Sequence, residues 1–322
     1  MNIFKILLTG IFISITGCTG QQEQDAAEAP TRPNIIYIMA DDLGYGDIGP
    51  FGQEMIKTPS LDRMASEGMR FTQHYSGSTV CAPSRSVLMT GLHTGHTPVR
   101  GNMEHMPIGQ YPIPYSIPTL PEVLKEAGYT TGAFGKWGLG YPGSEGSPSH
   151  QGFDEFFGYN GQRRAHFYYP EFLFREVRGQ QPVRVPLEGN KVEETSRENF
   201  RHPDSGPPIS RGTYSQDIIV EEALSFIDRN AEEKNPFFLY LPLSIPHASL
   251  TVPERAMEPY LDENGKSIFE EEPFPGDHYT AQPQTSCSVC CYGDAVGPIC
   301  WRSTPKIKRP GIDRKHASHF YQ

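Results

Sequence analysis

The sequence predicts an α/β protein in which helices flank a doubly wound, mostly parallel sheet. Two continuous apolar runs, "NIIYIMA" (34–40) and "PFFLYLPLSIP" (236–246), indicate strands that are buried on both faces, as parallel strands are. Segments with helical periodicity lie between these runs, and strands that alternate with helices favour a parallel sheet. Polar residues follow the end of each run, at the edge where open α/β sheets bind ligands.

Three segments between the apolar runs carry the marks of helices. "PSLDRMASE" (59–67) has its apolar residues on one face and is followed by glycine. "TLPEVLKEA" (119–127) opens with a capping box formed by Thr119 and Glu122. "YSQDIIVEEALSFIDRN" (214–230) is amphipathic along its whole length. We therefore expect a helix at each of these three segments.

The remaining segments are less regular. "TTGAFGKWGLG" (130–140) predicts a further strand that runs into a glycine-rich loop, on which Lys136 lies. The polar segment at 177–208 predicts a long loop or hairpin over the surface. The last segment, 285–322, shows neither helical nor strand periodicity and holds four of the six cysteines.

The composition limits the classes of partner. The chain has 322 residues, enough for one large domain or two small ones, and 37% of them are hydrophobic, which supports a packed core. The formal net charge of -10 at pH 7 argues against a general nucleic-acid binder. An anionic substrate is still compatible with this charge, because a local cationic pocket can override it.

The N-terminus resembles the leader of an exported bacterial lipoprotein. Lys5 precedes an apolar stretch of signal-peptide length, and "ITGC" (15–18) is similar to a lipoprotein box. This resemblance implies a signal peptide at 1–17, cleavage before Cys18 and lipid on the Cys18 thiol; an ordinary secretory signal cut nearby is the alternative. The polar segment at 18–32 predicts a flexible tether. We expect a membrane-anchored protein in the periplasm or at the cell surface.

Asp41 and Asp42 stand together at the end of the first apolar run. Paired carboxylates could hold Ca²⁺ or Mg²⁺, because both cations take oxygen ligands. The alternative for a bare pair is a capping or solvated acidic turn.

Cys81 opens the segment "CAPSRSVLMTG" (81–91), which predicts a helix with Pro83 in its first turn. A helix N-terminus presents free N–H groups and the positive end of the helix dipole, so a nucleophile there would lie beside an anion site. Arg85, one turn further on, could add a charge-assisted hydrogen bond to an oxyanion. A buried structural thiol is the alternative.

Lys136 and His247 each follow a predicted strand, and alone each has an ordinary alternative as a surface lysine or a structural histidine. Taken with the two aspartates, Cys81 and Arg85, they describe one site. It would contain a divalent metal, a nucleophile, two cations for an oxyanion and a histidine for proton transfer. Such a set fits the transfer of a sulfuryl or phosphoryl group.

The cysteine segment also carries a family resemblance. "CAPSR" followed by "TG" (81–91) is similar to the Cys-x-Pro-Ser-Arg and Thr-Gly signature of type I sulfatases, in the alkaline-phosphatase-like superfamily. The resemblance implies an alkaline-phosphatase-like fold for a catalytic domain at 33–284 and hydrolysis of an aryl or carbohydrate sulfate ester. Other stretches resemble the family in the same order: "NIIYIMADDLGYGDIG", "TPSLDRMASEGMRFTQHY", "GKWGLG", "GFDEFFGY" and "PFFLYLPLSIPHA".

The same resemblance implies cofactors and partners. In the family a maturation enzyme oxidises the signature cysteine to Cα-formylglycine, which would be made from Cys81. One hydroxyl of the hydrated aldehyde attacks sulfur and expels the alcohol; the other then loses its proton, so that the aldehyde re-forms and sulfate leaves. A bound Ca²⁺, with Mg²⁺ as the alternative, would lower the pKa of the attacking hydroxyl. The implied partners are the maturation enzyme, a sulfated small molecule or glycan, and the membrane through the lipid, with no nucleic acid.

The resemblance also implies the role of each site residue. Many members of the family have a histidine that contacts the formylglycine where this chain has Gly138. We expect His166 in "RRAHFYYP" to take that place as a substrate-binding residue; the alternative is a loop histidine. The other implied roles are metal ligation by Asp41, Asp42 and the modified Cys81, orientation of the modified side chain by Arg85, sulfate binding by Lys136, and proton donation to the leaving oxygen by His247.

The C-terminal segment departs further from the family. The family completes its metal site with an Asp-Asn pair beyond the place of "HYTAQPQ" (278–284), followed by a lysine, and this chain has neither. We interpret 285–322 as the out-of-frame tail of a truncated domain, because the codons around Cys290 and Cys291, read one nucleotide later, permit the helix expected there. The alternative is a genuine tail whose four cysteines bind zinc or form disulfides. We expect the truncated chain to be weakly active or inactive.

Two rival functions stay open. Phosphoryl-transfer hydrolases of the same superfamily usually have serine or threonine as the nucleophile, so Cys81 with Pro83 and Arg85 favours sulfate. A cell-surface binding lipoprotein could use the fold without catalysis, and Cys81 would then keep an intact thiol. The sequence determines neither the sulfated substrate nor the oligomeric state.

Overall fold

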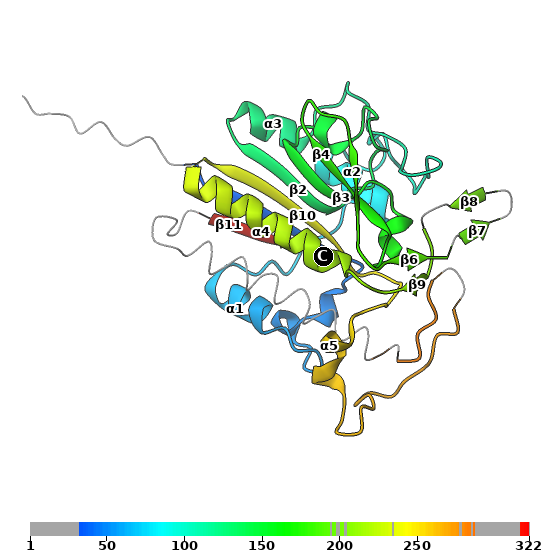
Figure 1. The fold of residues 1–322 in the computed structure, drawn as a ribbon. Coiled ribbons are helices and arrows are strands. Elements are labelled where there is room, and N and C mark those ends of the chain that lie inside the picture. Colours follow the sequence, from blue (N-terminus) through cyan, green and yellow to red (C-terminus); the bar gives the residue numbers. More distant parts are fainter. Residues whose placement is uncertain are drawn as a thin grey trace, which may run out of the picture. The chain divides into compact units, whose positions relative to one another are not determined.

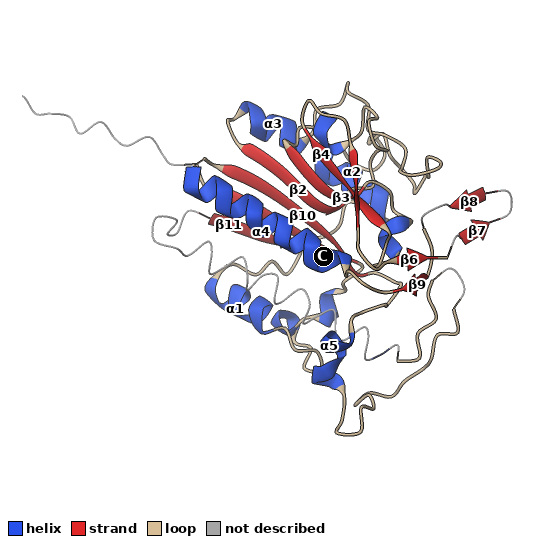
Figure 2. Ribbon diagram, viewed as in Figure 1, coloured by secondary structure: helices blue, strands red, loops and turns tan. Residues whose placement is uncertain are grey.

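The described part of the chain combines strands and helices, but they do not alternate strictly as the sequence predicts: one strand is followed by three α-helices, eight strands, one long helix and a further strand (Figures 1 and 2). The computed structural model describes residues 32–193, 195–197, 200–202, 205–233, 235–276, 279–284, 286 and 316–321. The helices are α1 (Pro59–Glu67), α2 (Cys81–Thr90), α3 (Leu120–Glu126), α4 (Ser215–Glu233) and α5 (Glu254–Met257). The strands are β1 (Asn34–Asp41), β2 (Thr130–Lys136), β3 (Glu155–Tyr159), β4 (Phe172–Val177), β5 (Val183–Pro186), β6 (Lys191–Val192), β7 (Thr195–Arg197), β8 (Phe200–His202), β9 (Pro208–Ser210), β10 (Phe237–Pro246) and β11 (His316–Tyr321).

The main sheet has seven strands in the order β11-β1-β10-β2-β3-β4-β5. The first five run parallel to their neighbours, and β4 and β5 join antiparallel at one edge. The prediction of a doubly wound, mostly parallel sheet is confirmed. The chain passes from β1 to β2, and β10 returns later to lie between them.

The tail contains one strand that the sequence did not predict. β11 pairs in parallel with β1, from Asn34↔His316 to Met39↔Tyr321. A strand edge offers unpaired backbone N–H and C=O groups, and another segment can pair with them whatever its side chains. The spacing of apolar residues in "HASHFY" therefore did not indicate a strand. The rest of the predicted tail (285–322) lies almost wholly outside the described residues, as do the predicted signal peptide (1–17) and most of the tether (18–32).

Alternate residues of the central strands pack on opposite faces of the sheet. In β1, Ile36 and Ile38 join one buried cluster, whereas Met39 joins another. In β10, Leu239 belongs to the first cluster and Tyr240 to the second. Successive side chains of a strand point to opposite faces, so a strand that is covered on both sides must be apolar throughout. This explains the two uninterrupted apolar runs.

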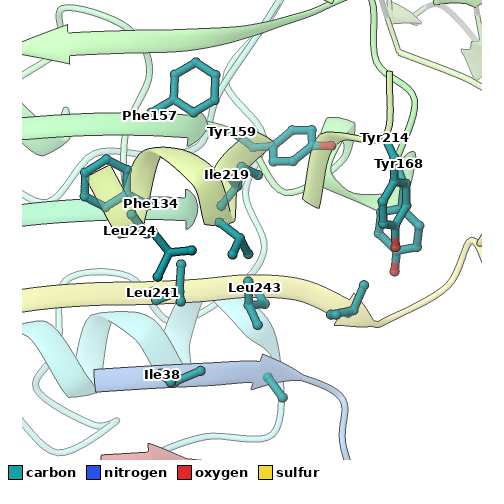
Figure 3. Packing of buried hydrophobic residues seen from close by; sticks show 14 of the residues in the cluster. Ile38, Phe134, Phe157, Tyr159, Tyr168, Tyr214, Ile219, Leu224, Leu241 and Leu243 are labelled. Carbon is teal, nitrogen blue, oxygen red and sulfur yellow. The ribbon is translucent and has the colours of Figure 1, made fainter. Parts of the chain in front are cut away.

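Helix α4 covers the first of these faces (Figure 1). Figure 3 shows Ile219 and Leu224 of α4 close to Leu241 and Leu243 of β10. Burying one such side chain fully stabilises the fold by about 1.5–3 kcal/mol, so the apolar face of α4 is a major source of stability. The cluster on the other face includes Ala82 and Met89 of α2, with Leu120 and Leu124 of α3 packed against it.

The polar segment at 177–208 is predicted as a loop or hairpin over the surface, but part of it joins the edge of the main sheet as β5. The described remainder forms small antiparallel pairs. β6 pairs with β9, and β7 pairs with β8.

Within the described ranges of the chain, no helix combines the length and the apolar character needed to cross a membrane.

Gly135 allows β2 and β10 to approach closely, and its replacement should loosen the sheet. It has a φ of 134°, and a Cβ at this position would lie 2.0 Å from the carbonyl oxygen of Pro242. We expect Gly135→Ala to lower the free energy of unfolding by about 3 kcal/mol, because the methyl group collides with backbone and the φ is strained for an L-residue. Urea denaturation measures the change.

Gly46→Ala is the matched control, because a Cβ at Gly46 meets nothing within 4 Å. It should change the free energy of unfolding by less than about 0.5 kcal/mol. Equal stability of the two variants would contradict the close approach of β2 and β10.

Candidate active site

Three polar side chains reach one edge of the sheet from three adjacent strands. Asp41 is the last residue of β1, Lys136 is the last residue of β2, and His247 directly follows β10. β10 lies between the other two strands, and all three run parallel, so their carboxyl ends meet. The structure therefore brings together three residues that the sequence singled out separately, at the edge expected to bind ligands.

Asp41 is buried between two cationic side chains. Lys136 Nζ donates to its Oδ2 at 2.5 Å, and Arg85 Nη2 lies 3.4 Å from its Oδ1. Arg85 Nη1 also donates to the carbonyl oxygen of Lys136, which ties α2 to the end of β2. Burial alone would raise the pKa of Asp41, but the charges of Lys136 and Arg85 outweigh it and hold that pKa well below its usual range. Asp41 is therefore ionised at neutral pH.

The backbone is irregular where β1 leads into Asp42. The register between β1 and β10 shifts between Met39 and Asp41, and Asp42 has a φ of 66°. Among the described non-glycine residues, Asp42 alone has a positive φ. Such strain recurs at functional sites. The Asp42 side chain is 66% exposed, and its Oδ2 lies 3.3 Å from His247 Nε2.

Cys81 is the first residue of α2, so the predicted helix is confirmed. The helix ends at Gly91, whose φ of 66° is the left-handed conformation that favours glycine. Cys81 Sγ lies 3.6 Å from Lys136 Nζ. Burial alone would raise the pKa of the Cys81 thiol, but a hydrogen bond with His247 and the charge of Lys136 lower that pKa below its ordinary value. The thiol therefore ionises more readily than that of a free cysteine.

The imidazole of His247 is oriented by the backbone. Its Nδ1 donates to the carbonyl oxygen of Ala248 at 2.6 Å, which leaves Nε2 to face Asp42 and Cys81. Burial opposes the charged ring, but the hydrogen bond with Cys81, the charge of Asp41 and the Ala248 carbonyl raise the pKa of His247 above its ordinary value. The ring can therefore hold a proton on Nε2, the atom that the Ala248 carbonyl leaves free.

His166 lies against His247. The two rings are nearly parallel, with centroids 4.4 Å apart and planes 9° apart. Burial, with the charges of Lys136 and His247, lowers the pKa of His166 to about 2, so this ring is neutral. The backbone N–H of Ser249 donates to the His166 carbonyl at 2.8 Å, which joins the loop before β4 to the segment after β10.

The space that a side chain at position 138 would need is already occupied. A Cβ at Gly138 would lie 1.8 Å from the Nε2 of Gln162, and its φ of 78° is left-handed. The carboxamide of Gln162 therefore takes the space next to this position, whereas His166 reaches the site through His247.

The donor types at this edge fit a hard divalent cation in part. Asp41, Cys81 and His247 each offer a ligand atom, and these atoms all lie within 4.8 Å of one another. The carboxylate of Asp42 adds a fourth group beside His247. Ca²⁺ takes about six to eight oxygen ligands, and the described residues bring two carboxylates to the edge.

Sequence reasoning missed three side chains that support the site. Asn102 Oδ1 accepts from the backbone N–H of Ala82 at 3.0 Å and so satisfies a donor at the start of α2. Tyr168 Oη donates to the carbonyl oxygen of His247 and holds the chain after β10. Tyr279 places its ring edge-on to both site histidines, His166 and His247. None of the three belongs to a motif or to a periodic pattern, so the sequence offered no sign of them.

Comparisons with known proteins agree with the fold. A family model described as sulfatase matches residues 33–291. N-acetylgalactosamine-6-sulfatase of Canis lupus familiaris is 34% identical over 254 residues, which cover 73% of this chain and 43% of that protein. Arylsulfatase G of Homo sapiens is 31% identical over 280 residues, which cover 82% of this chain and 50% of that protein. The solved structure of Ps i-CgsB in complex with k-i-k-neocarrahexaose is 25% identical, has a TM-score of 0.66, and is matched over 90% of this chain and 58% of its own.

This chain belongs to the sulfatase family. The predicted family is therefore confirmed, and so is the predicted fold class. The chain spans about half the length of the curated relatives that it matches. Cys18 and its predicted lipid lie outside the described residues.

Replacing Asp41 with asparagine would remove the counter-charge of two buried cations. Lys136 is 0% exposed and Arg85 is 1% exposed. We expect Asp41→Asn to lower the free energy of unfolding by about 3–5 kcal/mol at pH 7. Because the folded-state pKa of Asp41 lies below its unfolded value, this stabilisation is present at neutral pH and is lost as the pH falls below about 4. Denaturant titration of metal-free protein measures both effects.

Glu155→Gln provides the control for this measurement. It breaks the more exposed pair of Arg229 Nη2 and Glu155 Oε2, which are 2.6 Å apart. Its effect should stay below about 1 kcal/mol. Equal losses in the two variants would show that the buried pairing of Asp41 does not stabilise the fold.

The lowered pKa of Cys81 predicts an unusually reactive thiol. In metal-free protein with an unmodified cysteine, alkylation of Cys81 by iodoacetamide should reach half its maximal rate at a lower pH than for a free cysteine. Mass spectrometry of the peptide that contains Cys81 follows the rate. His247→Ala should move the profile to higher pH, because it removes a hydrogen bond to the thiolate. His96→Ala, at an exposed position, should leave the pH profile of alkylation unchanged. If the His247→Ala profile were identical to that of the parent, it would contradict the role of His247 in lowering the pKa of Cys81.

Proposed function

We propose that this chain carries the site of a sulfuric ester hydrolase that removes sulfate from an aryl or carbohydrate sulfate ester. The observation that carries the proposal is the set of contacts around Cys81. This residue begins α2, its Sγ lies 3.6 Å from Lys136 Nζ, and it is hydrogen-bonded to His247. A nucleophile, a cation and a proton-transfer group thus share one point at the sheet edge. Membership of the sulfatase family supports the same chemistry.

The sulfate group would be bound by cations and backbone dipoles. Lys136 Nζ already contacts both Asp41 and Cys81, so it can reach an oxyanion placed at the thiol position. The start of α2 adds the positive end of a ten-residue helix. Arg85 is held by Asp41 and by the Lys136 carbonyl. These contacts support a role for Arg85 in orienting the first turn of α2 and the side chain at position 81.

Proton transfer would fall to His247. Its Nδ1 is bound to the Ala248 carbonyl, so Nε2 is the atom that can donate to the leaving oxygen. The raised pKa of His247 favours the protonated ring that such a donor needs. His166 stacks on this ring in its neutral form. We propose that His166 fixes the plane of His247 and contributes a face to the bound substrate.

Two further groups would complete the chemistry. Conversion of Cys81 to Cα-formylglycine by a maturation enzyme would supply a hydrated aldehyde in place of the thiol. A divalent cation, Ca²⁺ or Mg²⁺, would be held by Asp41, Asp42 and the modified Cys81 and would supply positive charge near the sulfate oxygens. The buried carboxylate of Asp41 and the strained backbone of Asp42 support this ligand pair.

We infer that the substrate is a sulfated carbohydrate. The canine relative is named for a sulfated N-acetylgalactosamine, and the solved relative was crystallised with a neocarrahexaose. The proposed setting is the periplasm or cell surface, with anchorage through lipid on Cys18.

Coexpression with a formylglycine-generating enzyme tests the proposed nucleophile. The peptide that contains Cys81 should show the mass change from thiol to aldehyde, and Cys81→Ala should not. Released phenol from an aryl sulfate, with and without Ca²⁺, measures hydrolysis. We expect little or none from the 322-residue chain, because its described residues bring two carboxylates to a site that needs about six to eight oxygen ligands.

The outcomes separate the alternatives. An intact thiol after coexpression would favour a binding lipoprotein without catalysis. Hydrolysis of an aryl phosphate in preference to the sulfate would favour a phosphoryl-transfer enzyme. Strong calcium-dependent hydrolysis of the sulfate would support the reaction and overturn the expected weakness of this chain.

A further inference from the structure

Gln162 is a buried side chain whose hydrogen-bonding capacity the fold leaves unused. It is 3% exposed, and within the described ranges neither Oε1 nor Nε2 has a hydrogen-bond partner. A carboxamide can donate two hydrogen bonds and accept two. Buried polar groups are almost always paired, so an exception needs a specific explanation. A ligand that arrives from outside the protein is one such explanation.

The position of Gln162 is fixed by Gly138. The backbone N–H of Gly138 donates to the carbonyl of Asn160 at 3.0 Å, so the two segments continue the pairing of β2 with β3. A Cβ at Gly138 would lie 1.8 Å from Gln162 Nε2 and 2.7 Å from its Cδ. Any side chain at position 138 would therefore displace the carboxamide. Glycine at this position makes room for Gln162.

Two connections place Gln162 beside the candidate active site. From one end, Gly138 is the second residue after Lys136, whose Nζ lies 3.6 Å from Cys81 Sγ. From the other end, the Gln162 carbonyl accepts from the Ala165 N–H at 3.1 Å and so begins the turn that carries His166.

We propose that Gln162 is a substrate-binding residue, whose carboxamide donates a hydrogen bond to the sulfate group held at Lys136 and Cys81. This inference rests on the proposed function, because it assumes a sulfate at that point. A neutral donor suits the place. It can bind an anionic oxygen without competing with Lys136 and Arg85 for Asp41.

Gln151 offers a matched control within the same chain. It is also buried, at 0% exposure, but its Nε2 donates to the carbonyl oxygens of Ile113 and Glu145 at 3.2 and 2.8 Å. The amino group of its carboxamide therefore serves the fold, although its Oε1 has no hydrogen-bond partner among the described residues. The two glutamines should respond in opposite ways when methionine, which is similar in length and lacks the amide, replaces them.

Thermal unfolding and calorimetric titration with inorganic sulfate, on the full chain, give the two readouts. Gln162→Met should bind sulfate about tenfold more weakly or worse, because a hydrogen bond to a charged group is lost, while its Tm stays equal or rises. Gln151→Met should show the reverse, with a lower Tm and unchanged sulfate affinity. Unchanged affinity in Gln162→Met, or a fall in its Tm that matches Gln151→Met, would overturn the proposal and mark Gln162 as structural.

A direct measurement does not depend on the stability of either variant. In the ¹⁵N-labelled parent chain, the side-chain amide signals of Gln162 should shift on sulfate addition, whereas those of Gln151 should stay in place. Signals of Gln162 that stay in place while Lys136 responds would overturn this inference and leave the proposed function standing. Absence of any sulfate binding in the parent chain would overturn both.

Discussion

The buried carboxylate of Asp41 is the constraint on which the site depends. An ionised group with so little access to water needs opposite charges close by, and Lys136 and Arg85 supply them. These three residues belong to β1, β2 and α2, so one electrostatic requirement holds two strand ends and a helix start in register. This arrangement also fixes the position of Cys81, because Cys81 is the first residue of the helix that carries Arg85.

The chain departs from regular geometry at the same edge. The register of β1 slips before Asp41, Asp42 takes a left-handed conformation, and the two site histidines stack. Backbone strain persists only where the surroundings over-determine it. Here the surroundings are the sheet below and the loop at 160–168, which is tied to the segment after β10 through Tyr168 and His166. The irregular edge is therefore held by a regular core.

The buried glutamines show how the fold divides structural from functional polar groups. Gln151 uses its amide to bind two backbone carbonyls, as a polar side chain in a core usually does. Gln162 is equally enclosed, yet its amide finds no such partner among the described residues. Local agreement with folding rules is expected across most of a protein and fails mainly at functional sites. Gln110 shares this property among the described residues, but Gln162 is the one that lies next to Gly138, two residues beyond Lys136.

The sequence by itself determined β1, β2, β10 and the first four helices, and it identified Asp41, Cys81, Lys136 and His247, because hydrophobic periodicity, helix caps and the sulfatase signature are local patterns. Only the tertiary structure decided which strands are neighbours, that β11 joins β1, and that Gln162 rather than an open space stands beside Gly138. The stacking of His166 on His247 also lay beyond the sequence. These features arise from contacts between distant segments, and a contact of this kind leaves no period or motif in either of them.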